Sequence, residues 1–375
     1  MSPAVYDVLI VGAGIVGAAC AYECAKEGLR VAVVDKGMIG GGATAAGMGH
    51  IVVMDDSEPQ FALTHYSQKL WQSIRPELPD EVEYDQCGTI WVAADEQEMS
   101  EVRRKEKFYT KHGVATEVID ASTLQNCEPN LRKGLAGGLL VPEDGVLYAP
   151  CAAKFFLERA RSLGAQVDLG STVIRLGNGQ VSTATTEFSS GIVINAAGTW
   201  APELTQGLNI KKRKGHLLIT DRYPGFIKHQ LVELGYLKSA HSTMADSVAF
   251  NLQPRRTGQI LIGSSRQYGA EEKQVEHEIL AAMLYRAQEY MPGLSNMSTI
   301  RAWTGFRAAT PDKLPLIGPW PEDKHLFLAT GHEGLGITTS LGTAQLLVDQ
   351  IVGRTSAIPI EPYLPARSFS EHTHA

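Results

Sequence analysis

The chain has 375 residues, of which 44% are hydrophobic and 20% are charged. This length exceeds one ordinary hydrophobic core and predicts two domains, and the composition is normal for a soluble globular protein. The net charge of −7 excludes a general nucleic-acid surface, because phosphate binding needs a basic face. Short basic runs at 103–107 and 211–214 are typical of solvated faces or of the rim of a site.

The cysteines indicate neither a disulfide framework nor a metal site. Their number is odd and they form no CxxC pair, so we expect a reducing cytoplasm and no bound metal. The apolar stretch at 8–22 is interrupted by glycines and is too short for a membrane span, so we expect no transmembrane segment. The cysteines are Cys20, Cys24, Cys87, Cys127 and Cys151.

The predicted elements fall into two interleaved groups. An apolar strand at 6–11 leads through a glycine turn into a helix ending near residue 28, and a second strand follows at 30–34. The same alternation returns later in the chain, whereas the segments between consist of alternating strands and amphipathic helices. The later elements of the first group are a helix at 155–163, strands within 166–176 and at 191–195 and 325–329, and a helix at 337–352; those of the second are strands within 82–94 and 214–264 and helices at 96–112 and 274–291.

This order predicts an α/β protein in which a mixed-sheet α+β domain is inserted twice into a Rossmann-like dinucleotide-binding domain. The nucleotide domain comprises 1–80, 145–207 and 305–365. The inserted domain comprises 81–144 and 208–304, and we expect 366–375 to form a loose tail.

A glycine motif follows the first strand and opens the first helix. Gly12 permits the tight turn, Gly14 lets a pyrophosphate approach the backbone, and Gly17 lets the helix pack closely. Ile15 and Val16 begin the helix, whose positive dipole end faces the phosphates. The alternative is a glycine-rich turn in a plain α/β domain.

The second strand ends in Asp35 and Lys36. Asp35 stands 23 residues after Gly12, near the spacing expected of a carboxylate that holds a ribose. Such a carboxylate disfavours a 2′-phosphate and therefore NADP. An NAD-linked dehydrogenase remains an alternative at this point.

Four further segments carry a resemblance to a known family. They read GGGATAAGM at 40–48, VINAAGTW at 193–200, RAWTGFRAATPD at 301–312 and GHEGLGIT at 331–338. With the glycine motif, and in order along the whole chain, they resemble the D-amino acid oxidase (DAO) superfamily of FAD-dependent oxidoreductases. The most similar types are glycine oxidase, sarcosine oxidase and D-amino acid dehydrogenases, including the bacterial D-hydroxyproline dehydrogenase type.

The resemblance implies a glutathione reductase-type FAD-binding domain and a set of cofactor contacts. The small residues after the second strand admit a flat ring, and backbone N–H groups at the helix start near Ile337 would face the flavin N1 and C2 oxygen. Val173 would touch the adenine end through its backbone, or is simply a buried strand residue. The other implied contacts are Ala43, Thr44, Ala45, Gly47, Met48, Ala197, Gly198, Trp200, Gly334, Leu335, Gly336 and Thr338.

The resemblance also implies the substrate contacts. Arg307 would bind the substrate carboxylate through two parallel hydrogen bonds, and a structural salt bridge is its alternative role. His50 and His332 could tune amine protonation because histidine titrates near neutral pH, or could pack in loops. Asn251 stands where glycine oxidases place a tyrosine, and could bond a carboxylate or a hydroxyl.

Two details refine the expectation. Sarcosine oxidases attach FAD through a cysteine in the loop where this chain has Gly305, so we expect noncovalent FAD. The segment 211–216, KKRKGH, resembles the D-hydroxyproline dehydrogenase type, and its basic residues would favour an anionic substrate.

The expected function is oxidation of the Cα–N bond of a small D-amino or cyclic imino acid, such as D-hydroxyproline or D-proline. Hydride would pass to flavin N5, and the electrons would go to a partner protein, a quinone or another acceptor. A glycine or sarcosine oxidase that produces hydrogen peroxide is the nearest alternative. A flavin-holding subunit of a multi-subunit electron-transfer complex is an alternative of another class.

Overall fold

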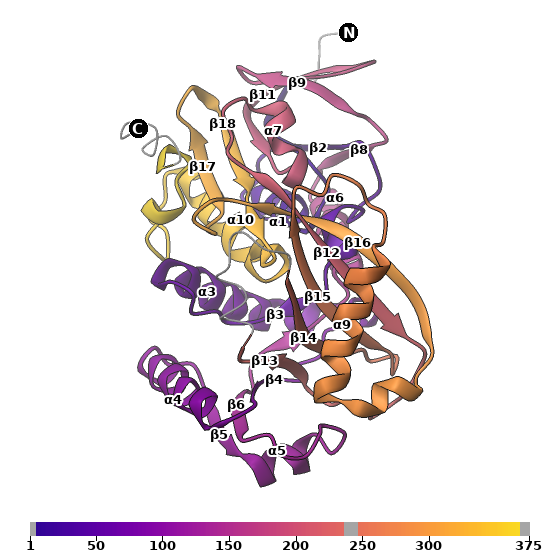
Figure 1. Ribbon diagram of the computed structural model, residues 1–375. Helices are drawn as coiled ribbons and strands as arrows, with labels where there is room; N and C mark the ends of the chain where they lie inside the picture. Colours follow the sequence, from indigo (N-terminus) through magenta and orange to yellow (C-terminus); the bar gives the residue numbers. More distant parts are fainter. Residues whose placement is uncertain (1–4, 236–246, 368–375) are drawn as a thin grey trace, which may run out of the picture.

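Two large sheets organise the computed structural model, which describes residues 5–235 and 247–367 (Figure 1). The first sheet has eight strands and contains the path β17-β18-β11-β1-β2-β8, extended through β10 and β9. The second has nine strands in the order β19-β16-β12-β15-β14-β13-β4-β6-β5. A two-stranded sheet of β3 (His50–Ile51) and β7 (Gly145–Val146) accompanies them. The chain therefore forms the predicted α/β architecture with a mixed sheet.

The first sheet has a parallel centre in which β1 lies between β11 and β2. β1, β2 and the end of β11 are mostly apolar and buried, as expected of parallel strands with both faces covered. Helices α1 and α10 pack against each other, and α1 also packs against α6. The elements are β1 (Val5–Val11), α1 (Ile15–Lys26), β2 (Val31–Asp35), α2 (Ala43–Ala46), α6 (Ala149–Ser162), β8 (Gln166–Leu169), β9 (Val173–Gly177), β10 (Gln180–Thr183), β11 (Glu187–Asn195), α7 (Ala201–Leu204), β17 (Leu316–Trp320), β18 (Asp323–Thr330) and α10 (Gly336–Val352).

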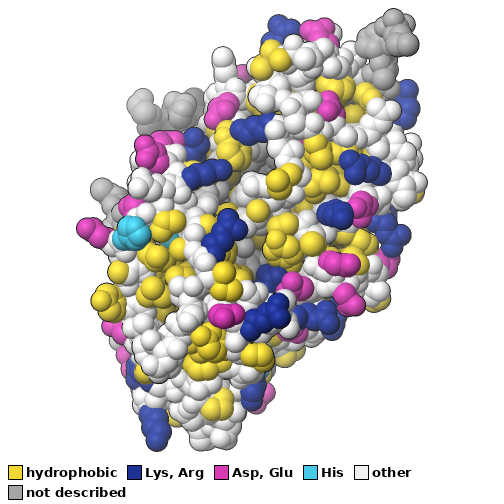
Figure 2. All heavy atoms as spheres, turned by 90° about the vertical axis from the view of Figure 1, so that its right-hand side faces the viewer, with side chains coloured by type: hydrophobic (Ala, Val, Ile, Leu, Met, Phe, Trp, Pro, Cys, Tyr) yellow, Lys and Arg dark blue, Asp and Glu magenta, His cyan; other side chains and the backbone are white. Residues whose placement is uncertain are grey.

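The second sheet is mostly antiparallel, and α9 packs against β14 and β15. On the face of the molecule that carries α9 and β16, acidic and basic side chains are interspersed with apolar ones (Figure 2). The elements are β4 (Thr89–Ala93), α4 (Glu96–Lys111), β5 (Glu117–Asp120), α5 (Ala121–Cys127), β6 (Gly137–Val141), β12 (Lys211–Thr220), β13 (Gln230–Glu233), β14 (Ser247–Pro254), β15 (Ile260–Tyr268), α9 (His277–Tyr290), β16 (Thr299–Ala309) and β19 (His332–Glu333).

Several elements were not predicted from the sequence, among them β5, α5, β6 and β17, and two others bear on the site. Helix α3 (Glu58–Ile74) begins at the N-cap Ser57, whose side chain accepts a hydrogen bond from the Gln60 N–H. The segment 301–312 was treated as a loop, but most of it belongs to β16, which pairs with β12 along nearly its whole length. The expected domain boundary between 304 and 305 therefore falls within a strand of the second sheet. The expected tail at 366–375 lies largely outside the described residues.

Within 5–235 and 247–367, no helix combines the length and the apolar character needed to cross a membrane.

The packing of α10 against α3 requires a glycine at position 342. A Cβ added to Gly342 would lie 2.2 Å from the Ser67 Oγ, so Gly342→Ala should lower the free energy of unfolding by about 1–3 kcal/mol. The measurement is urea unfolding of the holoprotein. Ser67→Ala removes the nearest obstructing atom, so the double variant should recover part of the loss. Equal losses in the single and double variants would contradict this contact.

Candidate active site

A large cavity of about 680 Å³ lies between the two sheets. The carboxyl ends of β1, β2 and β11 supply one end of its lining, and strands of the second sheet supply the other. Open α/β sheets bind ligands at the carboxyl ends of their strands, where the helices that follow those strands begin. The cavity is long and has three chemically distinct parts.

The first part surrounds the glycine motif. Gly12 has φ +116°, and a Cβ there would lie 2.5 Å from the Ala196 carbonyl oxygen, so the turn requires glycine. A Cβ on Gly17 would lie 2.0 Å from the Gly12 oxygen, so Gly17 allows close packing but does not line the cavity. Gly14, Ile15 and Val16 do line it, at the positive end of α1.

The carboxylate of Asp35 is fixed beside this turn. It accepts hydrogen bonds of 2.6 Å from the N–H groups of Ala13 and Gly37. Next to it, the Nζ of Lys36 lies 4.0 Å from the centre of the Trp200 ring. Val173, Ala197 and Gly198 complete the lining of this end. A carboxylate, an aromatic ring and bare backbone amides suit a ribose, an adenine and phosphates respectively.

The second part is a slot with few side chains. A Cβ on Gly305 would lie 2.3 Å from the Ala46 Cβ, and a Cβ on Gly47 would lie 2.8 Å from the Ile337 Cδ1. The segments approach so closely that only glycine fits between them. The slot is lined by Ala43, Thr44, Ala45, Gly47, Met48, Gly215, Gly305, Gly334, Leu335, Gly336 and Ile337.

Helix α10 begins at this slot, so its first N–H groups and positive dipole end favour a flat ring that gains negative charge. Thr338 does not line the cavity. Its hydroxyl donates a 2.8 Å hydrogen bond to the His50 carbonyl and thereby holds β3 against the helix. None of the five cysteines lines the cavity.

The third part is cationic. Arg307 projects from β16 over Gly215, where a Cβ would lie 2.5 Å from its Nη1, and that nitrogen donates to the Ser265 carbonyl at 3.1 Å. Burial opposes ionisation of Glu333, but the charges of three neighbouring arginines outweigh it and lower the pKa of Glu333. Three guanidinium groups thus act on one carboxylate at this end of the cavity. The arginines are Arg213, Arg266 and Arg307.

Arg266 and Glu333 line the cavity but were not found from the sequence. Arg266 stands on β15, and Glu333 on the two-residue strand β19. They are 67 positions apart, and neither belongs to a motif with defined spacing. β12 pairs with β15 on one side and with β16 on the other, and β16 pairs with β19, so strand pairing alone brings both residues to Arg307.

Both candidate histidines line the cavity, but neither titrates near neutral pH. Burial, together with the Arg307 charge, lowers the pKa of His50 to about 4, although a hydrogen bond with the Gly334 backbone opposes the shift. Burial lowers the pKa of His332 to about 3, and its Nε2 lies 2.9 Å from the Thr343 Oγ1. The expectation that either tunes amine protonation by titrating near pH 7 is therefore wrong.

Asn251 lies on β14 and lines the cavity. This residue is only 6% exposed, and its Oδ1 accepts no hydrogen bond from the described residues.

A parallel sheet with a glycine turn, a slot with few side chains and an arginine-rich end are the features of a dinucleotide-dependent oxidoreductase. The family model of DAO, FAD dependent oxidoreductase, matches residues 7–350, and the chain belongs to this family. The predicted family, FAD as its cofactor, and action on the CH–NH donors of amino acids are confirmed.

Individual relatives cover nearly the whole chain. The glycine oxidase of Geobacillus kaustophilus is 28% identical over 96% of each chain. The solved structure of that organism's glycine oxidase covers 96% of this chain and 98% of its own, at 27% identity and a TM-score of 0.86. The L-proline dehydrogenase structure from P. horikoshii covers 99% of both chains, at 25% identity and a TM-score of 0.86. The hydrogen cyanide synthase subunit HcnC of Pseudomonas aeruginosa is 27% identical over 96% of both chains.

Gly14→Val should abolish FAD binding, because its side chain would occupy the pyrophosphate path at the start of α1. The nearest protein atom to a Cβ there is the Thr44 Oγ1 at 3.3 Å, so the fold tolerates the substitution better than the cofactor does. The measurement is flavin absorbance of the purified protein, with circular dichroism as the control for folding. A folded variant that retains stoichiometric flavin would contradict the assignment.

His332 should make stability fall with acid. Its folded-state pKa of about 3 lies below its ordinary value of 6.5, so its contribution is complete above pH 6.5 and is lost as pH falls toward 3. At pH 5 the loss relative to pH 7 amounts to about 2 kcal/mol. Urea unfolding gives the free energy of unfolding at pH 7 and at pH 5. The difference between the two values should be smaller in His332→Gln than in the wild type by about this amount. An unchanged difference would show that His332 is already charged in the folded protein.

Proposed function

We propose that this enzyme oxidises the Cα–N bond of a small D-amino or cyclic imino acid, with D-hydroxyproline or D-proline as the favoured substrates. The observation that carries the proposal is the guanidinium of Arg307, which lies at the cationic end of the cavity beside the slot. Bound FAD, held noncovalently, supplies the hydride acceptor at N5. The protein's own residues bind and orient the substrate.

Arg307 fixes the substrate carboxylate by two parallel hydrogen bonds, which set orientation as well as affinity. The charges of Arg213, Arg266 and Arg307 act together on this end of the cavity and favour an anionic group there. His50 stays neutral because its pKa is about 4, so it adds no positive charge beside the substrate amine. A neutral amine supplies the electron pair that forms the C=N bond as hydride leaves, and no protein nucleophile is required.

A cyclic imino acid is supported by the L-proline dehydrogenase from P. horikoshii, which has the same fold over essentially the full chain. The basic run at 211–216 does not add to this support, because Arg213 pairs with Glu333 and Lys214 pairs with Glu276. Electrons would then pass to a partner protein or a quinone.

The glycine oxidase relatives support the alternative of a glycine or sarcosine oxidase that forms hydrogen peroxide. Anaerobic bleaching of the flavin with D- and L-prolines, hydroxyprolines, glycine and sarcosine separates the substrates. Comparing the yield of hydrogen peroxide with the reduction of an artificial dye shows whether oxygen or another molecule accepts the electrons. Stoichiometric peroxide with glycine would overturn the proposal in favour of the oxidase.

The HcnC relative, named as a subunit, supports the alternative of a flavin-holding subunit. In that case no amino acid would bleach the flavin of the isolated chain.

Arg307→Ala should raise the KM at least about 100-fold and leave FAD bound, because it removes a charge-assisted bidentate contact. The measurement is steady-state dye reduction with the flavin content determined in parallel. Arg301→Ala is the matched control, since Arg301 is exposed on the same strand and lies outside the cavity lining. Unchanged kinetics in Arg307→Ala would remove the arginine from this role.

A further inference from the structure

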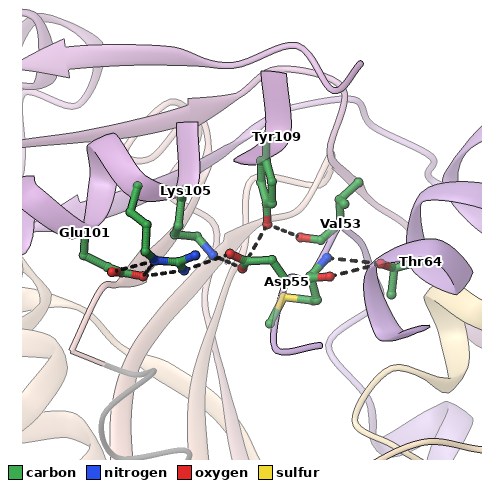
Figure 3. A network of polar contacts seen from close by, with 8 residues as sticks. Val53, Asp55, Thr64, Glu101, Lys105 and Tyr109 are labelled. Carbon is green, nitrogen blue, oxygen red and sulfur yellow. Dashed lines mark hydrogen bonds and ion pairs between the residues drawn. The ribbon is translucent and has the colours of Figure 1, made fainter. Parts of the chain in front are cut away.

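Two polar networks hold backbone segments that line the cavity. In the first, Asp55 pairs with the fully buried Lys105. The Tyr109 hydroxyl donates to the Val53 carbonyl at 2.9 Å in the same network (Figure 3). These contacts flank Met54, which lines the cavity. The second network reaches the arginine-rich end of the cavity, and its central group is a histidine that no step of the proposed reaction uses.

This histidine is His216 on β12, which is fully buried and lies outside the cavity lining. Its backbone N–H donates to the Ser265 Oγ at 2.8 Å, and its Nδ1 lies 3.0 Å from the same oxygen. Its Nε2 accepts a hydrogen bond of 3.0 Å from the Glu276 N–H. The imidazole therefore joins β15 to the residue that precedes α9.

These partners fix the protonation of the ring. A backbone amide only donates, so Nε2 carries no proton and Nδ1–H donates to the Ser265 Oγ. Burial lowers the pKa of His216, and the charges of Lys214 and Arg307 act in the same direction. The charge of Glu276 opposes this shift only in part. The ring therefore stays neutral at pH 7.

The far end of the imidazole is fixed as well. The Lys214 Nζ donates to the Glu276 Oε1 at 2.6 Å, and the Gln267 Nε2 donates to the Glu276 Oε2 at 2.9 Å. Because both carboxylate oxygens are held, the Glu276 N–H stays in line with His216. The basic run at 211–216 thus supports this histidine.

Ser265 lies where the pairing of β12 with β15 is irregular, since the register shifts within 214–218. Its carbonyl accepts a hydrogen bond of 3.1 Å from the Arg307 Nη1. Arg307 reaches this carbonyl from β16 across Gly215, where a Cβ would lie only 2.5 Å from the same nitrogen. Irregular pairing next to active sites commonly re-aims a side chain. The direction of the Arg307 guanidinium thus depends on where the Ser265 backbone lies.

We infer that His216 is a positioning residue for substrate binding: its Nδ1–H holds Ser265, and the Ser265 carbonyl holds Arg307 in the orientation that binds a carboxylate. The inference rests on the proposed function. A guanidinium forms two parallel hydrogen bonds with a carboxylate only when the two groups are aligned. A displaced carbonyl at position 265 would turn the guanidinium and weaken that pair.

Two substitutions separate the two ends of the imidazole. The amide nitrogen of asparagine takes the place of Nδ1 and can donate to Ser265, whereas the amide oxygen of glutamine takes the place of Nε2 and can accept from Glu276. His216→Asn should therefore keep Arg307 in place, and His216→Gln should release it.

The measurement is titration of the oxidised holoenzyme with pyrrole-2-carboxylate, followed by the flavin absorbance spectrum. This flat analogue of proline carries no hydrogen on the carbon that bears the carboxylate, so it binds without turnover. The uncharged pyrrole-2-carboxamide is titrated in parallel. His216→Gln should raise the Kd of the carboxylate about 10-fold and change that of the carboxamide less than about 3-fold. His216→Asn should keep both values within about 3-fold of the wild type.

Ser265→Ala removes the same contact from the other side. It should reproduce the effect of His216→Gln, and the double variant should be no weaker than either single variant. Tyr109→Phe is the matched control, because it removes a buried hydrogen bond to the cavity wall in the first network. It should change the two dissociation constants by the same factor. Flavin content reports folding of every variant.

Three outcomes overturn the inference while the proposed function stands: a wild-type Kd for the carboxylate in His216→Gln, equal losses in the asparagine and glutamine variants, or equal losses for the carboxylate and the carboxamide. If the wild-type flavin spectrum does not respond to the carboxylate, or if Arg307→Ala binds it as tightly as the wild type, the proposed function itself fails and the inference falls with it.

Discussion

The site depends on two close approaches at glycine positions. A Cβ on Gly305 of β16 would lie 2.3 Å from the Ala46 Cβ, and a Cβ on Gly47 would lie 2.8 Å from the Ile337 Cδ1 at the start of α10. Because the two glycines carry no side chains, these segments leave a narrow slot between them. Helix α10 begins at that slot. A side chain at position 305 would overlap Ala46 and force one of the two segments to shift.

The charge distribution follows from this geometry. β16 lies between β12 and β19, so Arg307 is placed next to Arg213 on one side and Glu333 on the other. Arg266 joins them from β15, and the charges of all three arginines lower the pKa of Glu333. The grouping of three guanidinium groups around Glu333 is therefore a result of strand order rather than of a local motif.

The features of the fold and site that could be predicted are those whose sequence pattern lies within a short segment of the chain. The glycine turn, Asp35 and the start of α10 were found because strand, turn and helix patterns lie within a few residues. β16 was missed because Gly305 and a run of exposed residues at its beginning weaken its alternation. Glu333 and Arg266 were missed because only strand pairing joins them. His50 and His332 were found as cavity residues, but their neutrality results from tertiary burial, which spacing does not reveal.

The substrate end is consequently built from groups whose charge does not change around neutrality. Guanidinium groups stay protonated, the lowered pKa of Glu333 keeps it ionised, and the two imidazoles stay uncharged with pKa values of about 4 and 3. Orientation of a carboxylate by such a site is constant from mildly acidic to mildly basic solution. In the proposed reaction, the amine of the substrate is then the group that must lose its proton before hydride can leave. The pH dependence of that reaction around neutrality would therefore come from the substrate rather than from these side chains.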